Sequence, residues 1–137
     1  MTYQELKNEY QKKLGELSNE CGLFWAFNSE QMKEGIEKNN ISKDNKMCSV
    51  GMGGYLPFKN YEKFSRGMKE LEKWEKAEKK AIKENKKELE KAVLYELSNY
   101  ECFYTGDYTK VYEIFPEVPA SEIKAIYNKN YDSYTNF

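Results

Sequence analysis

The fold of this chain is decided by residues 60–100, which read NYEKFSRGMKELEKWEKAEKKAIKENKKELEKAVLYELSNY. This stretch contains no proline and a single glycine. Its apolar residues recur every three or four positions at both ends, over residues 61–74 and again over residues 89–100. Because that spacing places them on one face of a helix, we predict helical structure throughout the stretch. One continuous helix would extend over roughly 60 Å, at about 1.5 Å per residue.

Between its two apolar ends, the stretch is dominated by lysine and glutamate. Pairs four residues apart, such as Glu72 and Lys76, stabilise a helix by only about 0.2–0.5 kcal/mol each, so packing at the ends must hold it. The pattern fits a solvated helix that bridges two packed regions, or two helices that meet near Asn85. A coiled-coil seam for a partner or a second copy is a third arrangement, although the heptad pattern is not kept for three repeats. Nucleic-acid binding is disfavoured, because glutamates interrupt the lysines.

Four further helices are predicted from capping residues and helical spacing. Residues 2–5, TYQE, form a capping box in front of the first helix. Asn28 or Ser29 is placed to cap the second, while Asp107 and Ser121 are placed to cap the last two. These helices are expected at residues 3–17, 30–38, 108–115 and from residue 121 onward.

Two apolar segments predict β-structure. Residues 22–27, GLFWAF, form a short aromatic run that is typical of a buried strand. Residues 47–50 and 55–58 flank the glycines of GMGG and predict a β-hairpin. The other interpretation of GMGG, a phosphate cradle, lacks the Lys-Ser/Thr that follows in a P-loop. We therefore expect an α+β fold, mainly helical with one long central helix and an antiparallel sheet of two or three strands, as a single domain over residues 1–137.

The composition limits the chemistry that this chain can perform. It has no histidine and one arginine, so histidine-dependent triads and metal sites cannot be assembled from it. Cys21, Cys48 and Cys102 are widely spaced and odd in number, which favours free thiols over disulfides or a zinc site. The net charge of −1 disfavours general binding to nucleic acid. We expect a non-enzymatic protein without cofactor or metal, and, since no apolar run approaches twenty residues and no leader is evident, without membrane contact.

Polar residues around the end of the long stretch form one candidate site. Asn99, Glu101 and Asp107 come close together in sequence, where the helical rhythm stops and Thr-Gly-Asp predicts a turn. One interpretation is an acidic pocket for a small ligand or a divalent metal, or an acid/base pair. The other is hydrogen bonding at helix ends, in which these side chains cap backbone groups.

Aromatic residues form a second candidate site. Twelve tyrosines are more than a small core needs, and tyrosine is enriched in protein interfaces because it joins a large apolar area to a polar tip. Most of them are expected in the core or half-buried. The residues expected to contact a partner are Trp74, Tyr100, Tyr104, Tyr127 and Tyr131.

Three segments together resemble a known kind of protein: FWAFNSEQMKEGIEK at residues 24–38, CSVGMGGYLP at residues 48–57 and LYELSNYECFYTGD at residues 94–107. They are similar to a family of small uncharacterised proteins carried by phages and other mobile elements of Firmicutes-like bacteria. The similarity covers residues 1–110, and its LYEL-N-x-E segment is the most specific part. Members often have histidine where Tyr100 stands, which argues against a metal or acid/base role at this position.

The resemblance implies a setting and no known activity. Small proteins of mobile elements often block host defences, and anti-CRISPR proteins are the best-known kind. We therefore expect a phage-encoded inhibitor, in the cytoplasm of the bacterial host, that binds a defence effector such as an RNA-guided nuclease. The alternatives are a ligand-sequestering or metal-dependent protein, with its site near the GMGG hairpin and the Asn99–Asp107 turn, and a homo-oligomer built on the long helix.

Overall fold

The computed structural model of the chain describes residues 1–135, and within that range it contains seven α-helices, one 3₁₀ turn and a three-stranded antiparallel sheet. The prediction of a mainly helical α+β fold is therefore confirmed. The chain divides into two compact units: residues 6–77, here called the sheet unit, and residues 1–5 with residues 78 onward, here called the helical unit. The prediction of a single domain over residues 1–137 stays a prediction.

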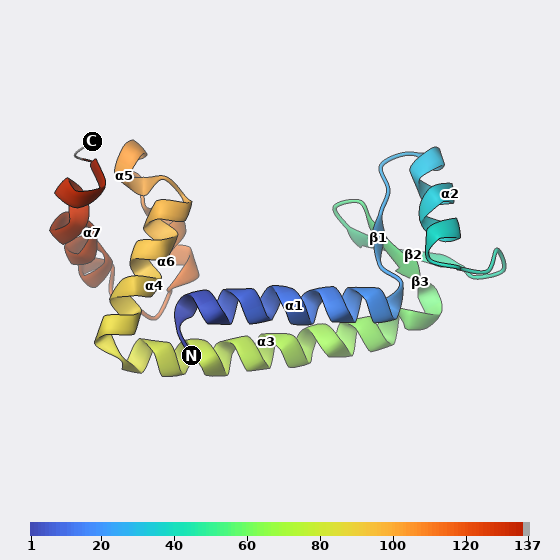
Figure 1. Cartoon of the computed structure of the whole chain (residues 1–137), viewed down its shortest axis with the longest axis horizontal. Helices are drawn as coiled ribbons and strands as arrows, with labels where there is room; N and C mark the ends of the chain where they lie inside the picture. The colour runs from blue at the N-terminus through green and yellow to red at the C-terminus, as the bar shows by residue number, and fades with distance from the viewer. Residues whose placement is uncertain (136–137) are drawn as a thin grey trace. The chain divides into compact units, whose positions relative to one another are not determined.

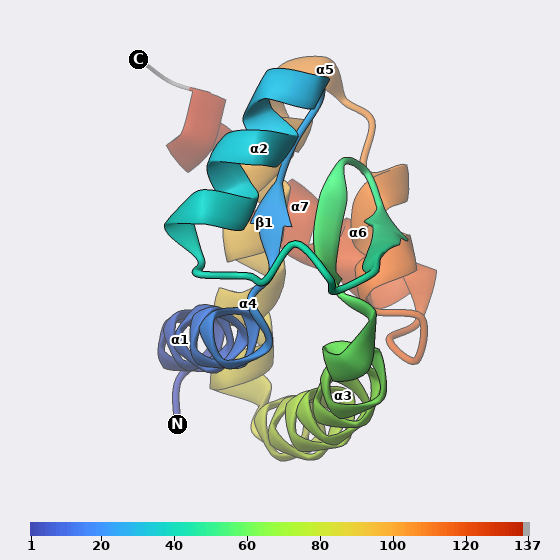
Figure 2. The same cartoon turned by 90° about the vertical axis from the view of Figure 1, so that its right-hand side faces the viewer.

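The sheet unit is built on two antiparallel helices, α1 (Tyr3–Cys21) and α3 (Tyr61–Glu84), which lie side by side in Figures 1 and 2. The two helices pack closely at Gly67, since a Cβ at this position would lie 2.5 Å from a methyl group of Leu17. Farther along α3, Leu71 is 6% exposed. Part of the apolar face of residues 61–74 is thus buried within the chain, whereas Tyr61 is 45% exposed. The prediction of a homo-oligomer built on this helix stays a prediction.

The sheet follows α1 and has the strand order β1–β3–β2, with both pairs antiparallel. Its strands are β1 (Phe24–Trp25), β2 (Met47–Gly51) and β3 (Gly54–Pro57). Helix α2 (Ser29–Lys38) packs against β1, as Figure 2 shows, because Gly35 leaves room for the ring of Phe24. The predicted hairpin is confirmed, and a 3₁₀ turn, Phe58–Asn60, leads from it into α3.

The prediction of a buried strand over residues 22–27 is wrong in length and in burial. Only Phe24 and Trp25 are in β1, and exposure alternates along the run: Phe24 and Ala26 are buried, whereas Trp25 is 58% and Phe27 is 75% exposed. A strand directs successive side chains to opposite faces. The side chains of Phe24 and Ala26 are covered, whereas those of Trp25 and Phe27 remain accessible to solvent.

The helical unit packs α4 (Lys86–Asn99), α5 (Cys102–Thr105), α6 (Thr109–Ile114) and α7 (Ala120–Thr135) around one core. The start of α1 contributes Tyr3, whose ring lies 5.7 Å from that of Tyr95 and 5.9 Å from that of Phe115. Glu96 is buried within this apolar core at 1% exposure. The core residues with no measurable exposure are Ala92, Val93, Leu97, Cys102, Val111 and Ile123.

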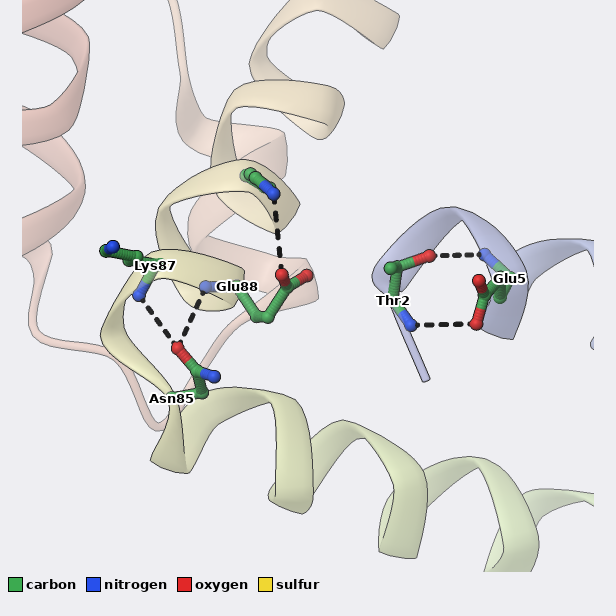
Figure 3. A network of polar contacts seen from close by, with 6 residues as sticks. Thr2, Glu5, Asn85, Lys87 and Glu88 are labelled. Atoms are coloured by element: carbon green, nitrogen blue, oxygen red, sulfur yellow. Dashed lines mark hydrogen bonds and ion pairs between the residues drawn. The ribbon is translucent and has the colours of Figure 1, made fainter.

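Residues 60–100 form two helices rather than one long central helix, and the second arrangement, a meeting near Asn85, is confirmed. Helix α3 has 24 residues and ends at Glu84. Asn85 then adopts an extended conformation, and its side chain accepts hydrogen bonds from the amides of Lys87 (3.1 Å) and Glu88 (3.4 Å), as Figure 3 shows. An asparagine that caps the next helix in this way ends the preceding one, which the lysines and glutamates around it would otherwise continue.

Other helix boundaries follow from capping. Thr2 and Glu5 exchange the two hydrogen bonds of a capping box, which Figure 3 also shows, and α1 continues to Cys21, four residues beyond its predicted end. The second helix is capped by Asn28, which accepts from the amide of Gln31 at 2.8 Å. The last helix begins at Ala120, so Ser121 lies inside its first turn instead of capping it.

Candidate functional site

Aromatic rings stack around Phe103 in the helical unit. Its ring lies 4.9 Å from that of Tyr127 and 4.7 Å from that of Tyr134, with interplanar angles of 6° and 11°. The two tyrosines are seven residues apart on α7, which is two helical turns or about 10.5 Å. That spacing accommodates one ring between them, so Phe103 fixes α5 against α7. Tyr108 extends the stack from Tyr127, with its ring at 4.9 Å.

An open groove of about 520 Å³ lies beside this stack, between the end of α4, α5 and the last turns of α7. We call it the tyrosine groove. Tyr104 is the most exposed aromatic residue of the groove, at 90%, and Tyr131 and Tyr134 are each 43% exposed. Exposed aromatic rings in a concave surface are typical of binding sites. The groove is lined by Leu97, Ser98, Glu101, Phe103, Tyr104, Tyr131, Tyr134 and Thr135.

Glu101 occupies an unfavourable backbone conformation at the rim of the groove. With φ 55° and ψ 31° it is left-handed, directly after Tyr100, the C-cap residue of α4. Its amide donates to the carbonyl of Ser98 at 3.1 Å, the bond that a glycine makes at the end of many helices. Glycine is favoured there because a Cβ in this conformation costs roughly 1–2 kcal/mol. Within residues 1–135, no hydrogen bond or ion pair holds the carboxylate of Glu101.

Of the three predicted polar residues, the structure places only Glu101 in the tyrosine groove. Asp107 is bound to the start of α6, where its carboxylate accepts from the amide (3.0 Å) and the hydroxyl (2.7 Å) of Thr109. These bonds lower the pKa of Asp107, so the helix-end interpretation is confirmed for this residue. Asn99 lines a neighbouring hollow together with Lys91 and Tyr134.

Of the predicted partner contacts, Tyr104 and Tyr131 line the tyrosine groove and Tyr127 stacks directly behind it. Burial, followed by the neighbouring tyrosines, raises the pKa of Tyr127, so its hydroxyl stays protonated at neutral pH. Tyr100 is 41% exposed but does not line the groove. Trp74 belongs to the sheet unit, where it is half-buried and the ammonium of Lys13 lies 5.1 Å from its ring centre.

Sequence reasoning missed two groups of residues. The first is Phe103, which completes the groove together with Tyr134. The seven-residue spacing of Tyr127 and Tyr134 was the signal for a shared helical face. The second group is an exposed cluster at the tip of the sheet, which we call the hairpin patch: Trp25, Phe27 and Met52. Phe27 covers Gly53, where a Cβ would lie 2.3 Å from its ring, and Met52 is 94% exposed.

The three cysteines are free, and Cys21 and Cys102 are buried. Burial, followed by the charge of Asp107, raises the pKa of the Cys102 thiol, which makes it a poor nucleophile at neutral pH. Over residues 1–135, no group of three histidine, cysteine, aspartate or glutamate side chains is arranged to hold a metal ion. In the same range, no helix has an apolar stretch long enough to cross a lipid bilayer.

Comparison with known proteins gives a family. The model of a family of unknown function, DUF7659, matches residues 2–132 and so extends beyond residues 1–110, where the resemblance was expected. No curated protein and no solved structure matches the chain. The expectation of an uncharacterised family is confirmed, whereas the phage origin and the anti-CRISPR role stay predictions.

Proposed function

The chain belongs to this family of unknown function, and from that premise we propose that it is a non-catalytic inhibitor that binds a host defence protein through the tyrosine groove. The observation that carries the proposal is the exposure of Tyr104, Tyr131 and Tyr134 around one hollow. Rings with two rotatable bonds supply contact area at a low entropic cost, which is why they dominate binding hot spots.

The arrangement of the groove supports protein binding in a second way. Its floor is fixed, because Phe103 is held between Tyr127 and Tyr134. A surface that is already ordered loses less conformational entropy when a partner binds. The choice of a defence effector, such as an RNA-guided nuclease, rests on the resemblance to proteins of phages and mobile elements.

A second candidate function is the sequestration of a small ligand. The groove volume of about 520 Å³ falls within the range of small-molecule sites, roughly 300–1,000 Å³. The groove is open to solvent, however, and a sequestering site usually encloses most of its ligand. Mass spectrometry of the purified protein under native conditions separates the two functions, because a sequestered metabolite adds a defined mass.

Photo-crosslinking tests where the partner binds. A p-benzoylphenylalanine in place of Tyr104 should crosslink one host protein in a bacterial lysate. The matched control carries the same group in place of Met52, which is similarly exposed at 94% but belongs to the hairpin patch. Crosslinking of that protein from position 52 and not from position 104 would overturn the assignment of the groove.

A plasmid-interference assay tests what the binding does. Cells that carry an RNA-guided nuclease programmed against a plasmid should keep the plasmid when this chain is expressed. The double substitution Tyr104→Ala/Tyr131→Ala should abolish the protection, whereas Met52→Ala should preserve it. If the unaltered chain protects no plasmid across the nuclease types found in Firmicutes-like hosts, the nuclease is not its target.

A further inference from the structure

Building on the proposed function of the tyrosine groove, we propose that the groove receives an arginine side chain of the partner protein, with Glu101 as its counter-charge. From the part of the chain that the structure describes, the groove offers aromatic faces and one carboxylate, and no other charged side chain. A guanidinium group can stack on the aromatic faces and pair with the carboxylate at the same time.

The charges around the groove determine the sign of the ligand. Among residues 1–135, Glu101 is the only charged residue that lines it. Its carboxylate is exposed and, within residues 1–135, is held by no other side chain. The neighbouring hollow shares Ser98 and Tyr134 with the groove and contains Lys91, but the ammonium of Lys91 lies 3.5 Å from the carboxylate of Glu88. An anionic ligand would therefore meet an uncompensated carboxylate, whereas a cation would neutralise it.

The aromatic lining distinguishes arginine from lysine. A guanidinium is planar, stacks on tyrosine and phenylalanine rings, and donates two parallel hydrogen bonds to a carboxylate. An ammonium is more strongly hydrated and acts as a point charge. The rings of Phe103 and Tyr134 are already nearly parallel, at 11°, so a further planar group can continue their stack beside Tyr104 and Tyr131.

The backbone at Glu101 provides an independent observation. Its φ of 55° is a conformation that glycine adopts without strain, and the amide of Glu101 makes the hydrogen bond that a glycine would make there. The side chain therefore makes the turn less stable, and it has no hydrogen bond within residues 1–135 that compensates for this. Strained residues with exposed polar groups are concentrated at binding sites.

A titration with two isosteric probes tests the inference. N-acetylarginine amide and N-acetylcitrulline amide have the same shape, but only the first is charged. Backbone amide NMR signals of residues 97–104 and 131–135 should shift with N-acetylarginine amide, at about fivefold lower concentration than with the citrulline probe. Glu101→Gln should remove that preference. The control Glu122→Gln, which changes an exposed glutamate at the other end of α7, should keep it.

The inference and the proposed function can fail separately. Equal binding of the two probes, or no shift at the groove, would overturn the arginine site. If the crosslink at position 104 persists in that case, the groove binds protein through apolar contacts alone and the proposed function stands. If the arginine probe binds as expected but no host protein crosslinks at position 104, the arginine site stands and the proposed function falls.

Discussion

Within residues 1–135, three residues with a side chain adopt the left-handed conformation that favours glycine: Asn40, Met52 and Glu101. The turns at Glu101 and at Met52 differ in what surrounds this residue. In the helical unit, Glu101 has a φ of 55° and borders a concave groove with ordered aromatic rings. In the sheet unit, Met52 has a φ of 54° and lies at the tip of the hairpin with 94% exposure. Met52 and Gly53 form a two-residue loop with positive φ at both positions, for which asparagine and glycine are preferred.

The difference between the two turns shows when a strained backbone position indicates a binding site. Both turns contain a side chain that the backbone does not favour, so strain alone does not separate a binding site from a tolerated irregularity. At Glu101 the side chain is charged and borders a hollow whose walls are fixed by stacking. At Met52 it extends into solvent beside Phe27, which covers Gly53. We therefore propose the groove, and not the hairpin patch, as the binding site.

The largest expected effect on the free energy of unfolding comes from truncating a buried phenylalanine in each unit, Phe103 in the helical unit and Phe24 in the sheet unit. Phe103 and Phe24 are each 8% exposed, so truncation to alanine should lower the free energy of unfolding by about 3–5 kcal/mol in each case. Phe103 also stacks closely on two rings, whereas Phe24 has one tilted neighbour, Tyr55, at 6.5 Å. Phe103→Ala should therefore cost more than Phe24→Ala, by about 0.5–1.5 kcal/mol per additional close pair.

Urea-induced unfolding of the two variants measures this difference. Phe58→Ala, at a 63% exposed position, is the control and should change the free energy of unfolding only slightly. A larger loss for Phe24→Ala than for Phe103→Ala would mean that the sheet unit, and not the aromatic stack, is the more tightly packed region.

The next effect compares Gly53 of the hairpin turn with Gly106, which follows α5 in the helical unit. Gly53 and Gly106 have φ values of 83° and 76°, so alanine is strained at both. At Gly53 the new Cβ would also lie 2.3 Å from the ring of Phe27, whereas nothing lies within 4 Å of it at Gly106. Gly53→Ala should cost about 2–4 kcal/mol and Gly106→Ala about 1–2 kcal/mol. Equal losses in urea unfolding would show that Phe27 moves away freely and does not hold the hairpin patch together.

A smaller effect, opposite in sign, is expected at the strained residues themselves. Glu101→Gly and Met52→Gly should each raise the free energy of unfolding by about 0.5–1 kcal/mol, because strain is relieved while the unfolded chain becomes more flexible. Only Glu101→Gly should also abolish the preference for N-acetylarginine amide. Thermal unfolding and the probe titration on the same two proteins measure both quantities. A loss of the preference in Met52→Gly would remove the distinction between the turns.

The local parts of the fold were predictable because single residues determine them. The capping box at residues 2–5 and the glycines around Met52 fix a helix start and a hairpin without reference to the rest of the chain. The exposure of Trp25 and Phe27 was not predictable, since it depends on which face of the sheet another element covers. The helix break at Asn85 was one of three arrangements that the sequence analysis left open, because asparagine can lie within a helix and can also cap one.

The candidate site was predictable only in part, because the residue types can be read from the sequence but their placement in the fold cannot. Glu101, Tyr104 and Tyr131 were expected from their residue types, and they do line one groove. Trp74 was grouped with them because of its chemistry, but it belongs to the other compact unit. Phe103 was missed because residues 101–107 were interpreted as a plain turn, whereas they contain the short helix α5 that brings its ring between two tyrosines.

The smallest expected effect is the loss of stability at low pH that comes from protonation of Asp107. Hydrogen bonds from the hydroxyl and the amide of Thr109 lower the pKa of Asp107, so this carboxylate binds its proton less readily in the folded chain than in the unfolded one. Its stabilising contribution is therefore present above the ordinary aspartate pKa of about 3.9 and is lost as the pH falls through the lowered value. The hairpin turn is held instead by the Ser49 hydroxyl, which accepts from the amide of Gly51 and does not titrate.

A carbon-detected NMR titration of the Asp107 carboxyl group measures its pKa directly. Thr109→Val keeps the backbone amide and removes the hydroxyl, so it should move the pKa of Asp107 upward, towards the ordinary value. Amide signals of residues 106–109 should change in the same acid range, while those of residues 51–53 should not. A pKa of Asp107 that is unchanged by Thr109→Val would assign the shift to the backbone amide alone. If the amide signals of residues 51–53 changed with pH as much as those of residues 106–109, protonation of Asp107 would not explain the change.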